Sequence, residues 1–381
     1  MKILSFKFQD QALEWKLEET SFNKLTLLVG ASGVGKTQIL KAVHALKEIA
    51  EGNSLNGVEW SVVFEVEKGQ IFSWTGAFET QKITIFEEEE EAVKRNQSNL
   101  IHERISLNGK VIAERKKEKI FFLDKATIKL SPQESLMSLL KEEDAIKEAS
   151  IALKKIHFSD QSDSLKEPFK IRLFNANKLA RKYDSLKKIQ EADEDIRVKL
   201  FLIYRNDKKV FNLIKDRFRD IFPQIEDIKV APLDIEDEDV PSIFKDYPFI
   251  QIKEAGVKKW VGQERISSGM FRTLIHVSEL YLCSEGTVFL IDEFENSLGI
   301  NCINEITDDI LKSRRQLQFI LTSHHPYIIN NIHFNNWKVV TRNAGVVKTH
   351  TGAEYNLGAS KHDAFMQLLQ LEEYQTGAEQ L

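Results

Sequence analysis

The stretch that decides the fold of this sequence is Gly30-Ala31-Ser32-Gly33-Val34-Gly35-Lys36-Thr37, which matches the pattern G-x-x-x-x-G-K-[ST]. In such a phosphate loop, glycines let backbone N–H groups surround phosphates, the lysine reaches the β- and γ-phosphates, and the final hydroxyl holds Mg²⁺. The pattern is specific only between a strand and a helix. Here residues 25–29 predict a buried strand, and residues 38–50 carry apolar side chains at helical spacing. We therefore expect a phosphate-binding loop.

Around this loop the sequence predicts a mixed α/β fold with a β-rich segment. Residues 2–8 alternate and predict a strand. Between residues 58 and 123, short β-rich runs are separated by turn signals, among them the hairpin dipeptide Asn108-Gly109. These features predict an antiparallel β-subdomain, with strands at 60–66, 71–74, 83–86 and 120–123.

The remainder of the chain predicts helices followed by a parallel sheet. Residues 134–220 are charged and mostly helical, with apolar positions near helical period at Leu179, Tyr183, Leu186, Ile189, Ile196 and Leu200. After them come a helix at 268–283 and apolar strands at 287–291 and 318–321, a βαβ pattern. We divide the chain into an N-terminal head part (1–133), an inserted helical lobe (134–220) and a C-terminal head part (221–381).

Two carboxylates end the apolar strand at 287–291. In a phosphate-loop protein the first, Asp292, is expected to bind Mg²⁺ through its water shell. The second, Glu293, is expected to polarise the attacking water as general base. An acidic strand end that merely faces solvent is the plain alternative.

A Ser-Gly turn precedes the helix at 268–283. Ser267, Ser268 and Gly269 stand at its start, where backbone N–H groups can bind an anion and where serine is also an ordinary helix cap. Further along, Thr322-Ser323-His324-His325-Pro326 follows a predicted strand. The alternative is a histidine pair without a role.

Together these motifs resemble, in their order along the chain, the soluble ABC-type ATPases related to the RecF and SMC heads. The resemblance implies an α/β P-loop NTPase head of the ABC type with an antiparallel β-subdomain and an inserted helical lobe. Residues 266–270, Ile-Ser-Ser-Gly-Met, resemble the ABC signature motif L-S-G-G-Q, with Ile for Leu, Ser for the first Gly and Met for Gln. The resemblance implies that Ser267, Ser268 and Gly269 of this signature turn contact the γ-phosphate bound by a second subunit. His324 would contact the γ-phosphate and Glu293, while His325 would pack or face solvent.

Two weaker motifs complete the resemblance. Gln133 would be the Q-loop residue that reaches Mg²⁺ and the attacking water, although a simple turn beside Pro132 explains it nearly as well. Asn296-Ser297-Leu298-Gly299 takes the place of the D-loop but lacks its common acidic residue. The wording around Asp292 and His324 looks closest to the AAA-like branch that includes OLD-family proteins and the phage-defence ATPases of Septu, PARIS and retron systems.

The function implied is an ATPase that uses ATP and Mg²⁺, closes as a dimer on ATP and controls a separate effector, such as a nuclease, in antiphage defence. The alternative is a repair or chromosome-type ATPase that clamps DNA directly, for which a basic stripe and salt-dependent binding are expected. A transporter subunit is disfavoured by the altered signature, and a non-hydrolysing scaffold by the complete set of hydrolytic residues.

Composition limits the remaining options. The 381 residues are 42% hydrophobic and 29% charged, which permits a large core, and the net charge of −5 implies no whole-molecule attraction to nucleic acid. We expect the two cysteines to be reduced thiols rather than a disulfide. The apolar runs are too short to span a membrane, and the N-terminus does not have the pattern of a signal peptide. These features predict a cytoplasmic protein. The acidic runs Glu87–Glu91 and Asp234–Asp239 are expected to be solvated loops, with a metal or nuclease site at the second as the alternative.

Overall fold

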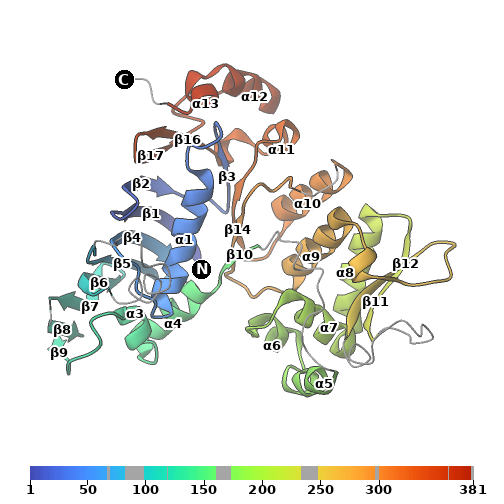
Figure 1. Cartoon of the computed structure of the whole chain (residues 1–381), viewed down its shortest axis with the longest axis horizontal. Helices are drawn as coiled ribbons and strands as arrows, with labels where there is room; N and C mark the ends of the chain where they lie inside the picture. The colour runs from blue at the N-terminus through green and yellow to red at the C-terminus, as the bar shows by residue number, and fades with distance from the viewer. Residues whose placement is uncertain are drawn as a thin grey trace, which may run out of the picture. The chain divides into compact units, whose positions relative to one another are not determined.

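The computed structural model describes residues 1–66, 69–81, 98–117, 119–159, 173–232, 248–296, 300–358 and 360–378. The chain forms two compact units. Unit 1 comprises Met1–Ser159, Glu285–Phe294 and Arg314–Leu381, and unit 2 comprises Asp160–Ser284 and Glu295–Ser313. Figure 1 shows the helices and strands of both units, coloured from blue at the N-terminus to red at the C-terminus.

Unit 1 is built on one large mixed sheet. Its strands, in chain order, are β1 (Lys2–Asp10), β2 (Trp15–Ser21), β3 (Leu25–Val29), β4 (Val58–Glu65), β5 (Ile71–Phe78), β6 (Leu100–Leu107), β7 (Lys110–Lys116), β8 (Lys119–Phe122), β9 (Lys125–Ala126), β10 (Ile156–Phe158), β14 (Val288–Ile291), β15 (Gln318–Thr322), β16 (Trp337–Asn343) and β17 (Val346–Thr351). The spatial order is β10-β14-β15-β3-β16-β17-β2-β1-β4-β5-β6-β7-β8-β9.

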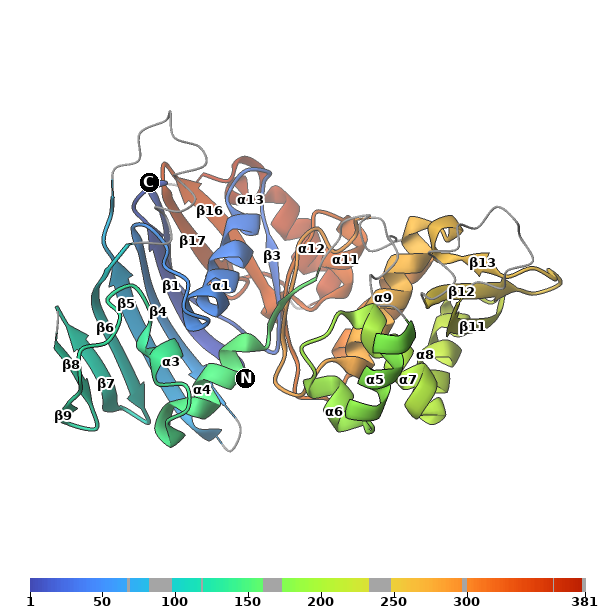
Figure 2. The same cartoon turned by 60° about the horizontal axis from the view of Figure 1, so that its bottom comes forward.

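The sheet has a parallel half and an antiparallel half. β10, β14, β15, β3 and β16 are parallel neighbours, as the βαβ pattern after residue 287 predicted. From β2 through β1 and β4 to β9, each strand is antiparallel to the next. Figure 2 shows the antiparallel strands β5 to β9 side by side at one end of the sheet. The predicted α/β class and the antiparallel β-subdomain are therefore confirmed.

The hairpin predicted at Asn108-Gly109 is confirmed. Leu107 and Lys110 are paired across the turn, and the two turn residues have φ angles of 49° and 81°. Positive φ at both positions is the geometry that Asn-Gly adopts most readily and that matches strand twist. The strand expected at 83–86 lies outside the described residues.

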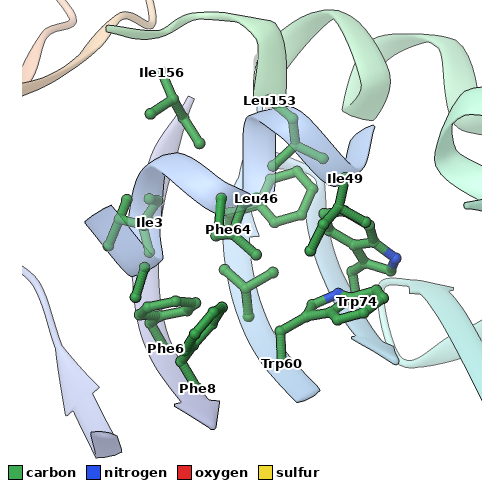
Figure 3. Packing of buried hydrophobic residues seen from close by; sticks show 14 of the residues in the cluster. Ile3, Phe6, Phe8, Leu46, Ile49, Trp60, Phe64, Trp74, Leu153 and Ile156 are labelled. Carbon is green, nitrogen blue, oxygen red and sulfur yellow. The ribbon is translucent and has the colours of Figure 1, made fainter. Parts of the chain in front are cut away.

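Helices cover the sheet of unit 1. They are α1 (Lys36–Ala50), α3 (Leu136–Leu139), α4 (Asp144–Lys154), α11 (Pro326–Asn331), α12 (Lys361–Gln370) and α13 (Glu372–Thr376), with the short 3-10 turn η5 (Phe334–Asn336). One face of α1 is buried, including Leu46 and Ile49. Figure 3 shows these two side chains and Leu153 of α4 beside Phe64 and Trp74 of the sheet. The apolar spacing that predicted α1 is thus the spacing that fills this core.

A buried polar network fastens the loop before α3 to the antiparallel strands. The carboxylate of Glu103, on β6, accepts hydrogen bonds from Trp74 Nε1, Ser135 Oγ and the backbone N–H of Leu136. Burial raises the pKa of Glu103, while these three hydrogen bonds and the charge of Arg115 oppose the rise. Arg115, its register partner on β7, donates to the carbonyls of Ser131 and Glu134.

Unit 2 combines helices with a small antiparallel sheet. Its helices are α5 (Leu173–Lys182), α6 (Leu186–Glu191), α7 (Ile196–Asn206), α8 (Lys208–Ile221), α9 (Ser268–Leu282) and α10 (Ile300–Lys312), with the 3-10 turn η4 (Gln263–Arg265). The sheet has the order β11 (Ile225–Ala231), β12 (Phe249–Glu254) and β13 (Val261–Gly262). Arg217 of α8 pairs with Glu305 and Asp309 of α10. Within the described residues, no helix has the length and apolarity needed to cross a membrane.

The helical lobe differs from the predicted segment in two ways. The apolar positions from Leu179 to Leu200 do not share one helix face, because turns separate α5, α6 and α7. Residues 134–159 belong to unit 1, where Leu153 and Ile156 enter its core, and β11 to β13 join the helices of unit 2. The compact units therefore cut across the boundaries drawn after residues 133 and 220.

The Glu103 network generates a stability prediction. Replacing Glu103 by Ala leaves the buried Arg115 guanidinium without its counter-charge and three buried donors without their acceptor. We expect a loss of about 3–5 kcal/mol in the free energy of unfolding, measured by urea denaturation. Glu114→Ala on the same hairpin is the matched control, since Glu114 pairs with the exposed Arg104, and it should cost about 1 kcal/mol or less. Equal losses in the two variants would contradict a supporting role for Glu103.

Candidate nucleotide-binding site

The phosphate-loop stretch lies where β3 meets α1. β3 ends at Val29 and α1 begins at Lys36, so both flanking elements predicted from the sequence are confirmed. Gly35 precedes the helix with φ 103°, and within the described residues no side chain caps the first turn. The N–H groups of a first helical turn carry positive partial charge. This end of α1 is therefore suited to binding an anion.

Two glycines of the loop are required by close packing. A Cβ atom on Gly30 would lie 2.7 Å from the carbonyl oxygen of Val340, a backbone atom of the neighbouring strand β16. A Cβ atom on Gly35 would lie 3.1 Å from a methyl group of Val347. Both residues also have positive φ, at 145° and 103°. Any other residue at position 30 would push the loop away from the sheet, and any other residue at position 35 would have to displace the side chain of Val347.

The side chain of Lys36 arches back over the loop. Its Nζ donates to the carbonyls of Gly30 at 2.9 Å and Ala31 at 2.8 Å, and the residue is only 6% exposed. A buried ammonium bonded to neutral carbonyls gains more from a charged acceptor. Lys36 is thereby positioned to turn to phosphate oxygens held by the same loop.

The acidic pair follows β14, and a hydroxyl from β15 holds it in place. Asp292 Oδ1 accepts hydrogen bonds from Thr37 Oγ1 at 3.1 Å and from Thr322 Oγ1 at 2.6 Å. Thr322 Oγ1 in turn accepts the backbone N–H of Glu293 at 2.7 Å. One hydroxyl thus fixes both carboxylate residues. No role was predicted for Thr322 from the sequence, where it directly follows the apolar strand predicted at 318–321.

Glu293 has an unusual backbone conformation. Its φ is 45°, in the left-handed region that costs a residue with a Cβ roughly 1–2 kcal/mol. The hydrogen bond to Thr322 Oγ1 and the bond from the N–H of Phe294 to the carbonyl of Thr322 hold this conformation. Such strain is typical of functional sites. Here it turns the chain directly after β14 and leaves the Glu293 side chain exposed.

A single cavity of about 310 Å³ brings these groups together. It lies wholly within unit 1. Its lining consists of Ser32, Gly33, Gly35, Lys36, Thr37, Gln38, Asp292, Glu293, Thr322, His324 and Arg342. The predicted loop, the acidic pair and His324 therefore surround one space. Arg342 and Gln38 also line the cavity, and neither was predicted from the sequence to belong to the site.

The histidine pair divides into two roles. His324 lines the cavity. His325 begins α11: its ring Nδ1 accepts the N–H of Tyr327 at 3.3 Å, and its own N–H donates to Ser323 Oγ. A side chain engaged as a helix cap has a structural reason for its place.

The donor chemistry at Thr37 and Asp292 fits a magnesium ion. Both residues offer oxygen atoms, a hydroxyl and a carboxylate, and the two atoms are 3.1 Å apart. Mg²⁺ prefers oxygen ligands and keeps several waters or substrate phosphates in its shell. These two residues would hold the ion at the edge of the phosphate cavity.

Gln133 is not brought to this cavity. It lies in the loop before α3, which the hydrogen bonds of Arg115 to Ser131 and Glu134 fasten to β7. The carbonyl of Pro132 also accepts the N–H of Leu100 on β6. These strands belong to the antiparallel half of the sheet, several strands away from β3. The expectation that Gln133 reaches the metal and the attacking water is therefore corrected: anchoring to β6 and β7 keeps the loop elsewhere.

The signature residues lie in unit 2. Ser267 caps α9, and its Oγ accepts the N–H of Met270 at 3.3 Å. Ser267 is exposed, and Ser268 and Gly269 form the first turn of the helix. Of the D-loop candidate only Asn296 is described, and the acidic cluster at 234–239 lies outside the described residues.

Solved structures to which this chain is similar include three SMC head domains. The match to the Smc head bound to the C-terminal winged-helix domain of ScpA has 14% identity and a TM-score of 0.49, and covers 92% of this chain and 97% of that one. The match to the Smc head domain with an extended coiled coil bound to the C-terminal domain of ScpA, derived from Pyrococcus furiosus, has 14% identity and a TM-score of 0.45. It covers 97% of this chain and 98% of that one. The match to the SMC head domain from Thermotoga maritima has 10% identity and a TM-score of 0.43, and covers 92% of this chain and 99% of that one.

Comparison at the sequence level gives one match. A search of curated proteins finds no significant similarity. A family model described as "AAA domain, putative AbiEii toxin, Type IV TA system" matches residues 25–330, a span that begins at the phosphate-loop strand and includes Asp292, Glu293 and His324. Because this match covers well over half of the chain, the protein belongs to that AAA-domain family of P-loop ATPases.

Proposed function

We propose that this protein binds and hydrolyses ATP, closes as a dimer on ATP and switches a separate effector, with antiphage defence as its setting. The observation that carries the hydrolytic part is the convergence of Lys36, Thr37, Asp292, Glu293 and His324 on one cavity. These groups supply a phosphate cradle, a metal-binding pair and a base, which is the set that phosphoryl transfer to water requires.

We infer a role for each side chain from this arrangement. Lys36 leaves the carbonyls of Gly30 and Ala31 and neutralises the β- and γ-phosphates. A magnesium ion held by Thr37 and Asp292 would balance further phosphate charge. Glu293, directed by its left-handed backbone, accepts a proton from the water that attacks the γ-phosphorus, while the bond to the bridging oxygen breaks. His324 stabilises the oxygen charge that develops on the terminal phosphate.

Hydrolysis is tested by Glu293→Gln, which keeps the size and backbone of Glu293 and removes its basicity. We expect ATP binding to be retained and turnover to fall by about a hundredfold or more.

Lys36→Ala is the companion variant and should weaken ATP binding roughly tenfold to hundredfold, because a buried charge-assisted contact is lost. Phosphate release and equilibrium binding are measured on the full chain. Unchanged turnover in Glu293→Gln would assign the base to another residue, and unchanged binding in Lys36→Ala would refute the phosphate loop.

Dimer closure rests on the signature turn. Ser267 is exposed at the start of α9, so its side chain and the adjoining N–H groups are accessible to a phosphate on a second subunit. A two-fold arrangement would pair each phosphate loop with the partner's signature turn and hold two nucleotides.

Closure is tested by Ser267→Arg in the Glu293→Gln background, with sedimentation measured with and without ATP. The parent should shift to a dimer with ATP, and the bulky Arg should abolish the shift, although the lost cap should cost only about 1 kcal/mol of stability. Ser185→Arg, also at an exposed helix start in unit 2, is the control and should dimerise normally. If the parent stays monomeric at saturating ATP, the dimer proposal is refuted, while the proposal that the protein binds ATP still stands.

The effector part of the proposal has support from the family description. That description refers to a toxin and a type IV toxin–antitoxin system, and such systems have more than one component. Of the predicted helical lobe, the helices α5 to α8 lie in unit 2, and they are our candidate docking surface for the effector. Co-purification of the protein with the products of neighbouring genes, with and without ATP, tests the idea. Failure of any neighbour to co-purify in either state favours the nucleic-acid alternative.

A basic cluster in unit 2 favours this second candidate, direct binding of nucleic acid. The amide of Asn206 donates to the carbonyls of Ala180 and Tyr183, so the end of α5, the end of α7 and the start of α8 meet. Their exposed cations are Lys178, Arg181, Lys182, Arg205, Lys208 and Lys209. Burial and the positive charges of Arg205 and Lys215 lower the pKa of Lys208. The carboxylate of Asp207 caps α8 by accepting backbone N–H groups.

The positions of two of these lysines are unfavourable for helix stability. Lys208 and Lys209 stand in the first turn of α8, where the helix dipole disfavours positive charge. A polyanionic strand at this cluster would reverse that penalty, since each phosphate contact releases counterions. The ring of Tyr204 lies 3.5 Å from Lys208 Nζ and orients the ammonium.

Charge reversal separates a specific surface from general repulsion. The double variant Lys208→Glu and Lys209→Glu should weaken binding of a labelled oligonucleotide by about tenfold or more. The slope of the logarithm of the binding constant against the logarithm of the salt concentration should fall by the amount expected for the loss of roughly two phosphate contacts. Lys187→Glu with Lys188→Glu changes the same net charge on α6, where both lysines already pair with carboxylates, and should have a smaller effect. Equal effects, read by fluorescence polarisation over a salt series, would contradict a defined binding surface.

A further inference from the structure

Arg342 lies at the same edge of the sheet as the phosphate loop. β16 is a parallel neighbour of β3, with Val339 beside Val29, so the next residues of the two strands emerge together. The close approach of Gly30 to the carbonyl of Val340 marks this point. Arg342 follows two residues later, and its side chain is exposed. The topology alone therefore delivers a guanidinium to the phosphate loop.

The side chain of Arg342 reaches the loop itself. Its Nη1 donates to the carbonyl of Gly33 at 3.4 Å, and its Nε donates to the carbonyl of Ala344 at 2.6 Å. The first of these is long for a hydrogen bond and is readily exchanged. The backbone N–H of Arg342 donates to the carbonyl of Gly377, which anchors the residue independently of its side chain. The backbone is thus fixed while the guanidinium keeps a weak contact that a stronger acceptor can replace.

The groups that share the cavity with Arg342 indicate which acceptor this is. Glu293 and His324, the groups assigned to the attacking water and the terminal phosphate, line the same space. Gly33 precedes Lys36 in the loop, and Lys36 serves the β- and γ-phosphates. An acceptor near Gly33 and beside Glu293 and His324 is therefore at the γ-phosphate end of a bound nucleotide.

We propose that Arg342 binds the terminal phosphate of ATP and makes the site prefer ATP over ADP. This inference rests on the proposed ATP-binding function. The planar guanidinium forms paired hydrogen bonds to phosphate oxygens, and a bond to a negatively charged acceptor is stronger than the long contact with a neutral carbonyl that it replaces. ADP lacks the γ-phosphate and leaves Arg342 bonded to Gly33 and Ala344. The cation therefore favours only the triphosphate.

The experiment compares the dissociation constants of ATP and ADP, with magnesium, on the full chain carrying Glu293→Gln so that ATP persists. Arg342→Ala should weaken ATP binding roughly tenfold to hundredfold and change ADP binding by less than about threefold. Arg342→Lys retains the charge without the fork and should give an intermediate loss. Arg104→Ala, an exposed arginine of β6 paired with Glu114, is the control and should leave both constants unchanged.

The outcomes separate the inference from the function on which it rests. An equal loss of ATP and ADP affinity in Arg342→Ala, or no loss of either, would overturn the terminal-phosphate role while ATP binding by the parent still stands. A parent that binds neither nucleotide, with Lys36→Ala indistinguishable from it, would overturn the proposed function as well. If Arg342→Ala melts at a lower temperature than the parent, Arg342→Lys decides: a selective loss of ATP affinity supports the role, and parent-like affinities for both nucleotides refute it.

Discussion

The shared carboxyl edge of the parallel strands β14, β15, β3 and β16 is the constraint on which the site depends. Each strand ends in a residue, or is followed by one, that lines the cavity: Asp292 after β14, Thr322 at the end of β15, the phosphate loop after β3 and Arg342 near the end of β16. These positions are far apart in the chain and are aligned only by strand register. In open α/β sheets, ligands bind outside the carboxyl ends of the strands.

That register is fixed by hydrophobic burial. Every residue of β3, β14 and β15 is buried, so these strands are covered on both faces. Phe289 and Phe319 stack at 5.0 Å between neighbouring strands, and a shift in register would separate them. Apolar packing thus places Asp292 beside Thr322, and the hydroxyl of Thr322 then fixes the acidic pair. The chemistry of the site follows from the core.

This dependence explains how much the sequence could predict. The phosphate loop was identified because loop, strand and helix are contiguous, and the acidic pair because an apolar strand ends there. Thr322 and Arg342 belong to the site only through pairing between strands, which a linear pattern does not contain. Gln133 shows the converse, because its place in the order of motifs suggested the site, while the buried partners of Glu103 and Arg115 hold its loop on the antiparallel strands.

The chain path links the two units at β14. β14 belongs to unit 1, but the residues up to Ser284 and those from Glu295 belong to unit 2. Glu293 is therefore two residues from a crossing between units, and α9, which begins at Ser267, leads into the other crossing. Only residues 283–287 separate the end of α9 from the start of β14, the strand that leads to the residue that we assign as the base. Because Glu293 occupies a strained conformation held by two hydrogen bonds to Thr322, a small displacement of β14 against β15 would be enough to change its geometry.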